Sequence, residues 1–176
     1  MQLKLTLLLF LVFLCGLQIS AQEKPDISLD DFVGNWTVDK DKTYSKSERK
    51  DVVDYTVKIS RNDKTIVVYW DYTIRSRGKD YHSYYHDDFV LDGKEKEIKR
   101  GDTRGPWAQK ASFDGKKLKC RYNYRTTQQT TGAYLDYKTF FFSKDKKYLV
   151  IESVFRSSGR FTPTDTESKT LYLVKE

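Results

Sequence analysis

The two histidines, His82 and His86, are the residues best suited to bind a metal or to act as a catalytic base. Four residues of spacing would bring them together on a helix, but the sequence around them alternates as a strand does. On a strand that rises about 3.3 Å per residue they stand about 13 Å apart, whereas a zinc-bound nitrogen lies about 2 Å from the metal. We therefore predict no shared metal site and no cofactor; a single histidine that binds haem inside the fold stays open.

A catalytic nucleophile would have to be a serine or a cysteine beside a histidine base. The chain has no Gly-X-Ser-X-Gly motif, and Cys120 alternates with Leu118 and Tyr122 on one strand face, which favours burial. Asp87 and Asp88 are adjacent on a strand and face opposite sides, so they cannot form a facing acid and base pair. The sequence thus predicts no catalytic residues and favours a protein that is not an enzyme.

The chain is basic, with a formal net charge of +7 that falls to +6 when Lys4 is removed with the amino-terminal segment. The lysines concentrate in turns and at outward strand positions, where they also protect strand edges from pairing with other chains. Residues 99–106 form a basic turn with no helix after it, and therefore no phosphate-binding loop. The Arg-Gly-Asp triplet at 100–102 is common by chance, so we predict neither adhesion nor a nucleic-acid partner.

The amino terminus has the features of a secretory signal. Lys4 is followed by an apolar run to about Leu17 and by small residues that end at Ala21. The run is too short for a stable membrane span. We predict that residues 1–21 are a signal peptide cleaved near Ala21, that residues 22–27 are a short tether, and that the protein is exported, either periplasmic or secreted. Cys15 follows Leu14 rather than a small residue, which argues against a lipoprotein.

From Trp36 onward the polar and apolar residues alternate with the period of half-buried strands. Turn signals recur every 8–12 residues, and Asp92-Gly93 and Asp114-Gly115 are strong hairpin signals. The faces that this alternation defines, of which those with the candidate aromatic residues could point inward, are Val53, Tyr55, Val57, Ile59; Ile66, Val68, Trp70, Tyr72, Ile74; the mixed face Tyr81, Ser83, Tyr85, Asp87, Phe89; Leu118, Cys120, Tyr122, Tyr124; Ala133, Leu135, Tyr137, Thr139, Phe141; Leu149, Ile151, Ser153, Phe155; and Leu171, Leu173.

This pattern predicts an all-β fold: a single up-and-down antiparallel barrel of about 8–10 strands, formed by one domain over residues 28–176. No helix-length segment interrupts the strands, which argues against a parallel sheet. Short hairpins in sequence order favour a meander that closes on itself and so removes its edges. A Greek-key sandwich is the alternative.

Several residues carry a resemblance to a known family. A short helical turn at Ser28–Asp31 leads into Gly34-Asn35-Trp36, which resembles the Gly-X-Trp opening of lipocalins and of the wider calycin group. Residues 135–137, Leu-Asp-Tyr, resemble the second lipocalin signature, and the Asp-Gly hairpins resemble those of small bacterial lipocalin-like domains. The resemblance implies a barrel in which Trp36 lies under the floor, Gly34 lets the chain bend, and Arg156 packs on Trp36.

A barrel of this size can enclose one small ligand. Aromatic residues make up 15% of the chain, and 13 of them are tyrosines, which combine a flat apolar surface with a hydroxyl. We predict an exported binding protein that holds a small hydrophobic or amphipathic molecule, with oligomeric state open. The candidate cavity lining is Trp70, Tyr72, Tyr85, Tyr122, Tyr137 and Phe141. Two alternatives are a protein-interaction or inhibitor module that uses its surface loops, and an isomerase or cyclase on the same barrel.

Overall fold

The computed structural model describes residues 27–46, 51–98, 107–125, 132–159 and 165–176. The predicted signal peptide, most of the predicted tether and the basic turn at 99–106 lie outside these residues.

The described chain consists of strands, one short 3₁₀ helix and one short α-helix. The elements in order are η1 (Leu29–Phe32), β1 (Gly34–Val38), α2 (Lys40–Lys46), β2 (Val52–Asn62), β3 (Thr65–Ser76), β4 (Lys79–Val90), β5 (Lys96–Ile98), β6 (Trp107–Phe113), β7 (Leu118–Arg125), β8 (Gly132–Phe142), β9 (Leu149–Gly159) and β10 (Asp165–Lys175).

All ten strands belong to one antiparallel sheet with the order β4-β3-β2-β1-β10-β9-β8-β7-β6-β5. Apart from the pairing of β1 with β10, every neighbour in the sheet is also a neighbour in sequence. The prediction of an all-β, up-and-down antiparallel fold is therefore confirmed, and the Greek-key sandwich is excluded for the described strands.

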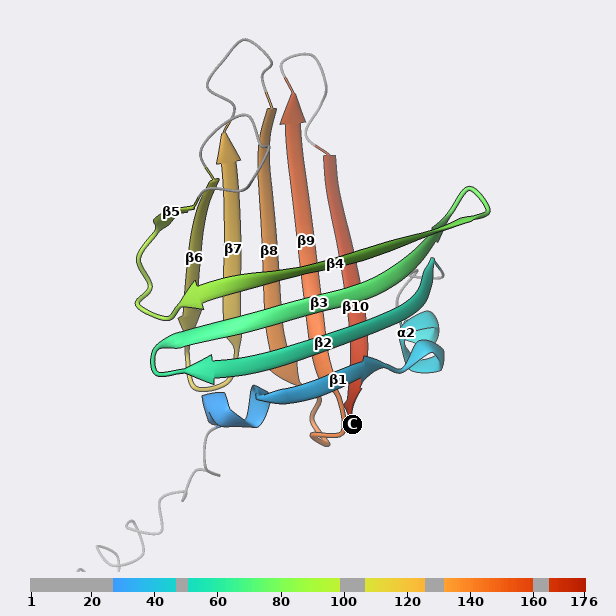
Figure 1. Ribbon diagram of the computed structural model, residues 1–176, viewed down its shortest axis with the longest axis horizontal. Coiled ribbons are helices and arrows are strands. Elements are labelled where there is room, and N and C mark those ends of the chain that lie inside the picture. Colours follow the sequence, from blue (N-terminus) through green and yellow to red (C-terminus); the bar gives the residue numbers. More distant parts are fainter. Residues whose placement is uncertain (1–26, 47–50, 99–106, 126–131, 160–164) are drawn as a thin grey trace, which may run out of the picture.

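The sheet curls back on itself, so that β1 to β4 run across the front of β6 to β10 (Figure 1). Its two ends meet where the Gln109 side chain of β6 donates a hydrogen bond to the carbonyl of Asp88 in β4. The rings of Phe89 and Tyr122 lie 5.4 Å apart across the same junction. The backbone amide of Gly93, just after β4, also donates a hydrogen bond to the Ala111 carbonyl of β6 at 3.2 Å. In the described residues no strand ladder pairs β4 with β5 or β6.

One predicted hairpin signal acts as expected and one does not. Gly115, with φ of 85°, lies in the turn that joins the paired strands β6 and β7. Gly93, with φ of 67°, follows β4, but the next strand, β5, lies at the opposite end of the sheet. The positive φ bends the chain there without returning it onto its own strand.

The interior of the curled sheet is filled from both layers. Val57, Val68, Phe140 and Leu173 are each fully buried. On β2 the register shifts between Val52 and Asp54. Because of that irregularity Val52 is buried, whereas the simple alternation predicted Val53 on the inner face.

The helix α2 was not predicted from the strand pattern. Asp39 begins it, because its carboxylate accepts a hydrogen bond from the Lys42 amide at 2.8 Å. Thr43 is fully buried and its hydroxyl bonds to the backbone of Tyr172, which fixes the helix against β10. Neither this helix nor any other in the described residues has the length and apolar character needed to cross a membrane.

Candidate functional site

Four of the predicted cavity residues lie together on the inner face of the curled sheet. The Trp70 ring is 6.2 Å from that of Tyr85, and the Tyr85 ring is 6.2 Å from that of Tyr72. Trp70 and Tyr122 are buried, whereas Tyr72 and Tyr85 are only partly buried and pack against the core. Tyr55, which stacks on Tyr72 at 4.9 Å, extends this aromatic wall.

The other two predicted cavity residues face outward. Tyr137 is 37% exposed, and Phe141 has the ammonium group of Lys117 4.7 Å from its ring centre. Their neighbour Phe140 is fully buried and lies opposite Leu118 and Ile151. Because side chains alternate along a strand, burying Phe140 places Tyr137 and Phe141 on the outer face. The assignment of these two residues to the cavity lining is therefore wrong.

The face of β8 that does point inward carries charge. Asp136 and Lys138 share the face of Phe140 and form an ion pair with each other. Lys138 is held deep in the sheet, with its ammonium group 5.5 Å from the Trp70 ring centre and 5.2 Å from that of Tyr122. The sequence analysis placed neither residue on the inner face.

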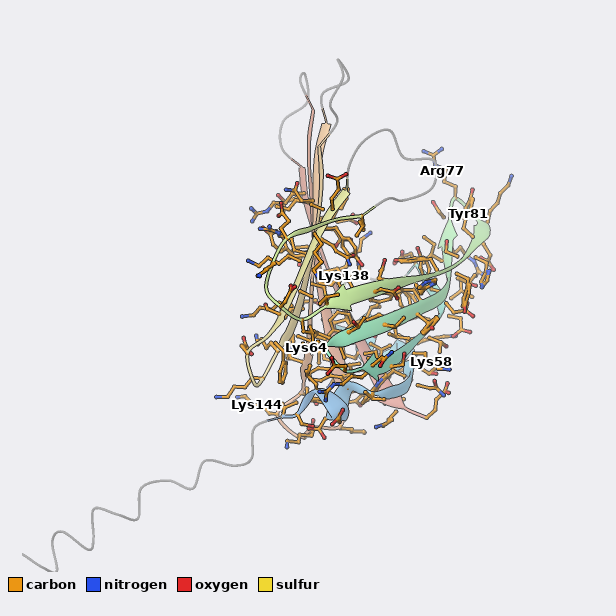
Figure 2. The ribbon with its side chains drawn as sticks, turned by 60° about the vertical axis from the view of Figure 1, so that its left-hand side comes forward. Lys58, Lys64, Arg77, Tyr81, Lys138 and Lys144 are labelled. Atoms are coloured by element: carbon orange, nitrogen blue, oxygen red, sulfur yellow. The ribbon has the colours of Figure 1, made fainter. Side chains whose placement is uncertain are left out.

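A second inward carboxylate completes an inner polar cluster of Asp87, Asp136 and Lys138. Asp87 is only 5% exposed, and its carboxylate accepts a hydrogen bond from the Trp70 indole at 2.9 Å. With two carboxylates and one ammonium group, the cluster offers both donors and acceptors beside the aromatic wall. Figure 2 shows Lys138 in the interior beside the end of β4.

Exposure increases steadily along the inner face of the back strands. On β8 the exposed fraction is 0% at Phe140, 11% for the Lys138 side chain and 27% for that of Asp136. On β9 it rises from 1% at Ile151 to 39% at Phe155. This end of the interior, which we call the open end, is thus reached by solvent, whereas the opposite, closed end is sealed.

The same change appears on β10, where Leu173 and Leu171 are buried. The next two inward residues, Lys169 and Glu167, pair with each other, and their side chains are 35% and 53% exposed. In Figure 1 the back strands extend beyond the front layer at this end. The open end therefore combines solvent access with inward charge.

Nucleophilic catalysis by Cys120 is not supported by its surroundings. The thiol is fully buried, and that burial raises its pKa well above the usual range, so it stays protonated. His82 points outward, where its imidazole lies 2.7 Å from the Asp71 carboxylate, and His86 lies outside against Tyr69. In the described part of the chain, no cluster of three or more His, Cys, Asp or Glu side chains could hold a metal ion.

The residues of the Gly-X-Trp motif lie at the closed end. Trp36 is 3% exposed, and its indole donates a hydrogen bond to the Phe32 carbonyl at 2.8 Å. Gly34 has φ of 144°, and a Cβ atom there would lie 2.8 Å from Cε of Lys175. The backbone thus leaves room for the Lys175 side chain to lie across Trp36.

Arg156 does not pack on Trp36. It is exposed on β9 and pairs with Leu135 and Thr166 near the open end. Leu149, whose register partner Phe142 contacts Trp36, is seven residues away, or about 23 Å along the strand. The cation over the Trp36 ring is Lys175, at 5.3 Å, and it fills the place that the resemblance assigned to Arg156.

Comparisons with known proteins add little. No protein-family model matches the chain, and a search among curated proteins finds no match. Among solved structures, apo lipid binding protein 8 of Caenorhabditis elegans is similar with a TM-score of 0.46 and 13% sequence identity, over 85% of this chain and 99% of that one. This likeness is too distant to indicate a function.

Proposed function

We propose that this protein is exported after cleavage near Ala21 and binds a small amphipathic molecule at the open end of its barrel. The observation that carries the proposal is the gradient of exposure along the inner face, from the sealed Phe140 to the solvent-reached Asp136. A ligand that enters along this face meets partly buried aromatic side chains and a cluster of charges. Sites for small organic molecules commonly combine apolar walls with a few convergent polar groups.

The two parts of the ligand would contact different residues. Tyr72 and Tyr85, partly buried on the front layer, offer flat apolar surface to its hydrophobic part. Asp136 and Lys138, on the back layer, offer an acceptor and a donor to its polar part. Since Trp70 lies beneath Lys138 and is fully buried, it supports the site and does not line it.

Native mass spectrometry of the protein purified from its own host tests the proposal. We expect a discrete bound mass that is released on denaturation and is identified as an amphipathic small molecule. The adjacent tyrosines of β4 provide a matched pair of variants, because Tyr85 faces inward and Tyr84 is 64% exposed on the outside. Tyr85→Ala should reduce the bound fraction and Tyr84→Ala should leave it unchanged; equal fractions in both would contradict the proposal.

A second candidate is catalysis in the same place, because Asp87, Asp136 and Lys138 are titratable groups gathered in one interior. Such groups could transfer protons in an isomerisation or cyclisation. Incubating the identified ligand with the protein and following its proton NMR spectrum distinguishes the two. A new set of ligand signals that disappears in Asp136→Asn would establish an enzyme, and an unchanged spectrum would establish a carrier.

A further inference from the structure

A separate pocket of about 250 Å³ lies at the closed end of the curled sheet. Its aromatic lining is Trp36 and Phe142, whose rings meet at 5.8 Å. Lys138 is four residues from Phe142 along β8, so about 13 Å of strand separates this pocket from the inner polar cluster. The pocket is therefore distinct from the site of the proposed function.

The charges around the pocket are mostly positive. Three exposed lysines line it, Lys146, Lys147 and Lys175, against one acidic residue, Asp31. The Asp31 carboxylate already accepts a hydrogen bond from the Ser28 amide at 2.8 Å, within the cap of η1. Three cations, with a single carboxylate that already accepts a hydrogen bond, favour the binding of an anion in this pocket.

One of the three lysines lies in space that the backbone leaves at Gly34. Lys175 lies with its ammonium group 5.3 Å from the Trp36 ring centre, and its side chain passes over the position where Gly34 lacks a Cβ. Any larger residue at position 34 would displace it, because the gap is only 2.8 Å. Lys175 is exposed, and the absence of a Cβ at Gly34 leaves room for its side chain to lie with the ammonium group beside the Trp36 ring.

The size of the pocket limits the ligand. Sites for drug-sized molecules span about 300–1,000 Å³, and this one is slightly smaller, at about 250 Å³. It suits a molecule of one or two rings. A ring would lie mainly against the half-buried Phe142, because Trp36 is 3% exposed and Lys175 lies across its ring. An attached carboxylate would reach the lysines, where charge-assisted hydrogen bonds are the strongest available.

We propose that this closed-end pocket binds a small aromatic carboxylate, independently of the barrel interior. Three observations carry the proposal together: the aromatic residues Trp36 and Phe142, the excess of lysines over acidic residues, and the space at Gly34 in which the Lys175 side chain lies.

The tryptophans allow a test that separates this pocket from the barrel. We would titrate the purified protein with 2-naphthoate and follow the indole N–H signals of Trp36 and Trp70, which report the pocket and the interior. Saturable movement of the Trp36 signal is expected, with little movement of Trp70. The neutral analogue 2-naphthalenemethanol should bind at least about tenfold more weakly, as expected for the loss of a charged hydrogen bond.

Two variants and one control come from the chain itself. Lys175→Gln removes the cation over Trp36. Lys146→Asn removes a second lysine of the pocket lining, and asparagine adopts the φ of 57° at that position more readily than most residues. Each should weaken 2-naphthoate binding by about tenfold. Lys144→Gln is the control, because Lys144 (Figure 2) lies in the same turn and is not among the residues that line the pocket.

The remaining outcomes would overturn the proposal. Equal affinity for 2-naphthoate and its neutral analogue would show that the lysines do not select an anion. A fall in affinity for Lys144→Gln equal to that for Lys175→Gln would indicate only diffuse attraction to surface charge. Movement of Trp70 without Trp36 would show that the probe enters the barrel alone, which overturns this pocket while leaving the proposed function standing.

Discussion

The inner face of β8, β9 and β10 is divided into two halves with opposite character. Toward the closed end Phe140, Ile151 and Leu173 are almost completely buried. Toward the open end, on the same strands, the inward residues include Lys138 and Lys169, each paired with a carboxylate. The first half has what a stable core needs, and the second has what a binding site needs. Stability and binding should therefore respond to different substitutions.

The largest expected effect comes from two phenylalanines on opposite sides of this division. Phe140→Ala should lower the free energy of unfolding by about 3–5 kcal/mol, because it empties a fully buried site beside Trp70. Phe155→Ala should cost less than about 1 kcal/mol, since Phe155 is 39% exposed. Urea denaturation measures both. Similar losses for the two variants would remove the distinction between the halves.

Cys120 lies next to the division, opposite Lys138 in the register of β7 and β8. Burial raises the pKa of its thiol above the unfolded value, so its contribution to stability is complete below about pH 8.5 and declines as the pH rises further. Between pH 8 and pH 10 the free energy of unfolding of the unchanged protein should fall by about 2 kcal/mol more than that of the Cys120→Ala variant. Parallel curves of unfolding free energy against pH would contradict the buried position of this thiol.

The charged half should be replaceable without loss of stability. Lys138→Met alone leaves the Asp136 carboxylate without its ion-pair partner and should cost about 1–2 kcal/mol. The double variant Asp136→Leu with Lys138→Met should restore or exceed the original stability, as replaced buried ion pairs often do. It should also lose the bound ligand. A double variant that unfolds more readily than either single one would assign the pair to structure rather than to binding.

The smallest effect is expected at the closed end, in the turn between β6 and β7. The Lys119 ammonium group and two backbone amides hold the pKa of Asp114 at about 2. Because the folded pKa is the lower one, this stabilisation is present above about pH 4 and is lost as the pH falls from there toward 2. Asp114→Asn should lower the free energy of unfolding by at most about 1 kcal/mol at pH 6, since the ion pair of Asp114 with Lys119 is exposed. Identical costs at pH 6 and pH 2 would contradict this assignment.

Much of the fold follows from alternation and turn residues. The inward faces of β3, β4, β7 and β9 are those that the period of two predicts, and Trp70, Tyr72, Tyr85 and Tyr122 lie on them. Long stretches with one apolar face and one polar face specify their register strongly. The short α2 and the irregularity near Val52 were not predicted, since each depends on contacts with distant strands.

The inner face of β8 could not be predicted from its sequence, because the more polar of its two faces is the one that points inward. Tyr137 and Phe141 sit on one face, and Asp136, Lys138 and Phe140 on the other, so the less polar face was assigned inward. Pairing with β7 and β9 imposes the opposite choice, because Phe140 must meet Leu118 and Ile151. Local patterns are expected to fail where a site buries charge. Asp136 and Lys138, two residues apart in a strand that is otherwise mostly apolar and aromatic, were the available signal.

The most direct test of binding at the open end is to block it. Ser153 is partly buried on the inner face of β9, opposite Lys138, and the adjacent Glu152 is exposed on the outer face. Ser153→Trp should fill the space beside the inner polar cluster, whereas Glu152→Trp adds the same ring outside. With the host ligand as titrant, calorimetry should show binding abolished in Ser153→Trp and unchanged in Glu152→Trp. Full affinity in a folded Ser153→Trp variant would contradict binding inside the barrel.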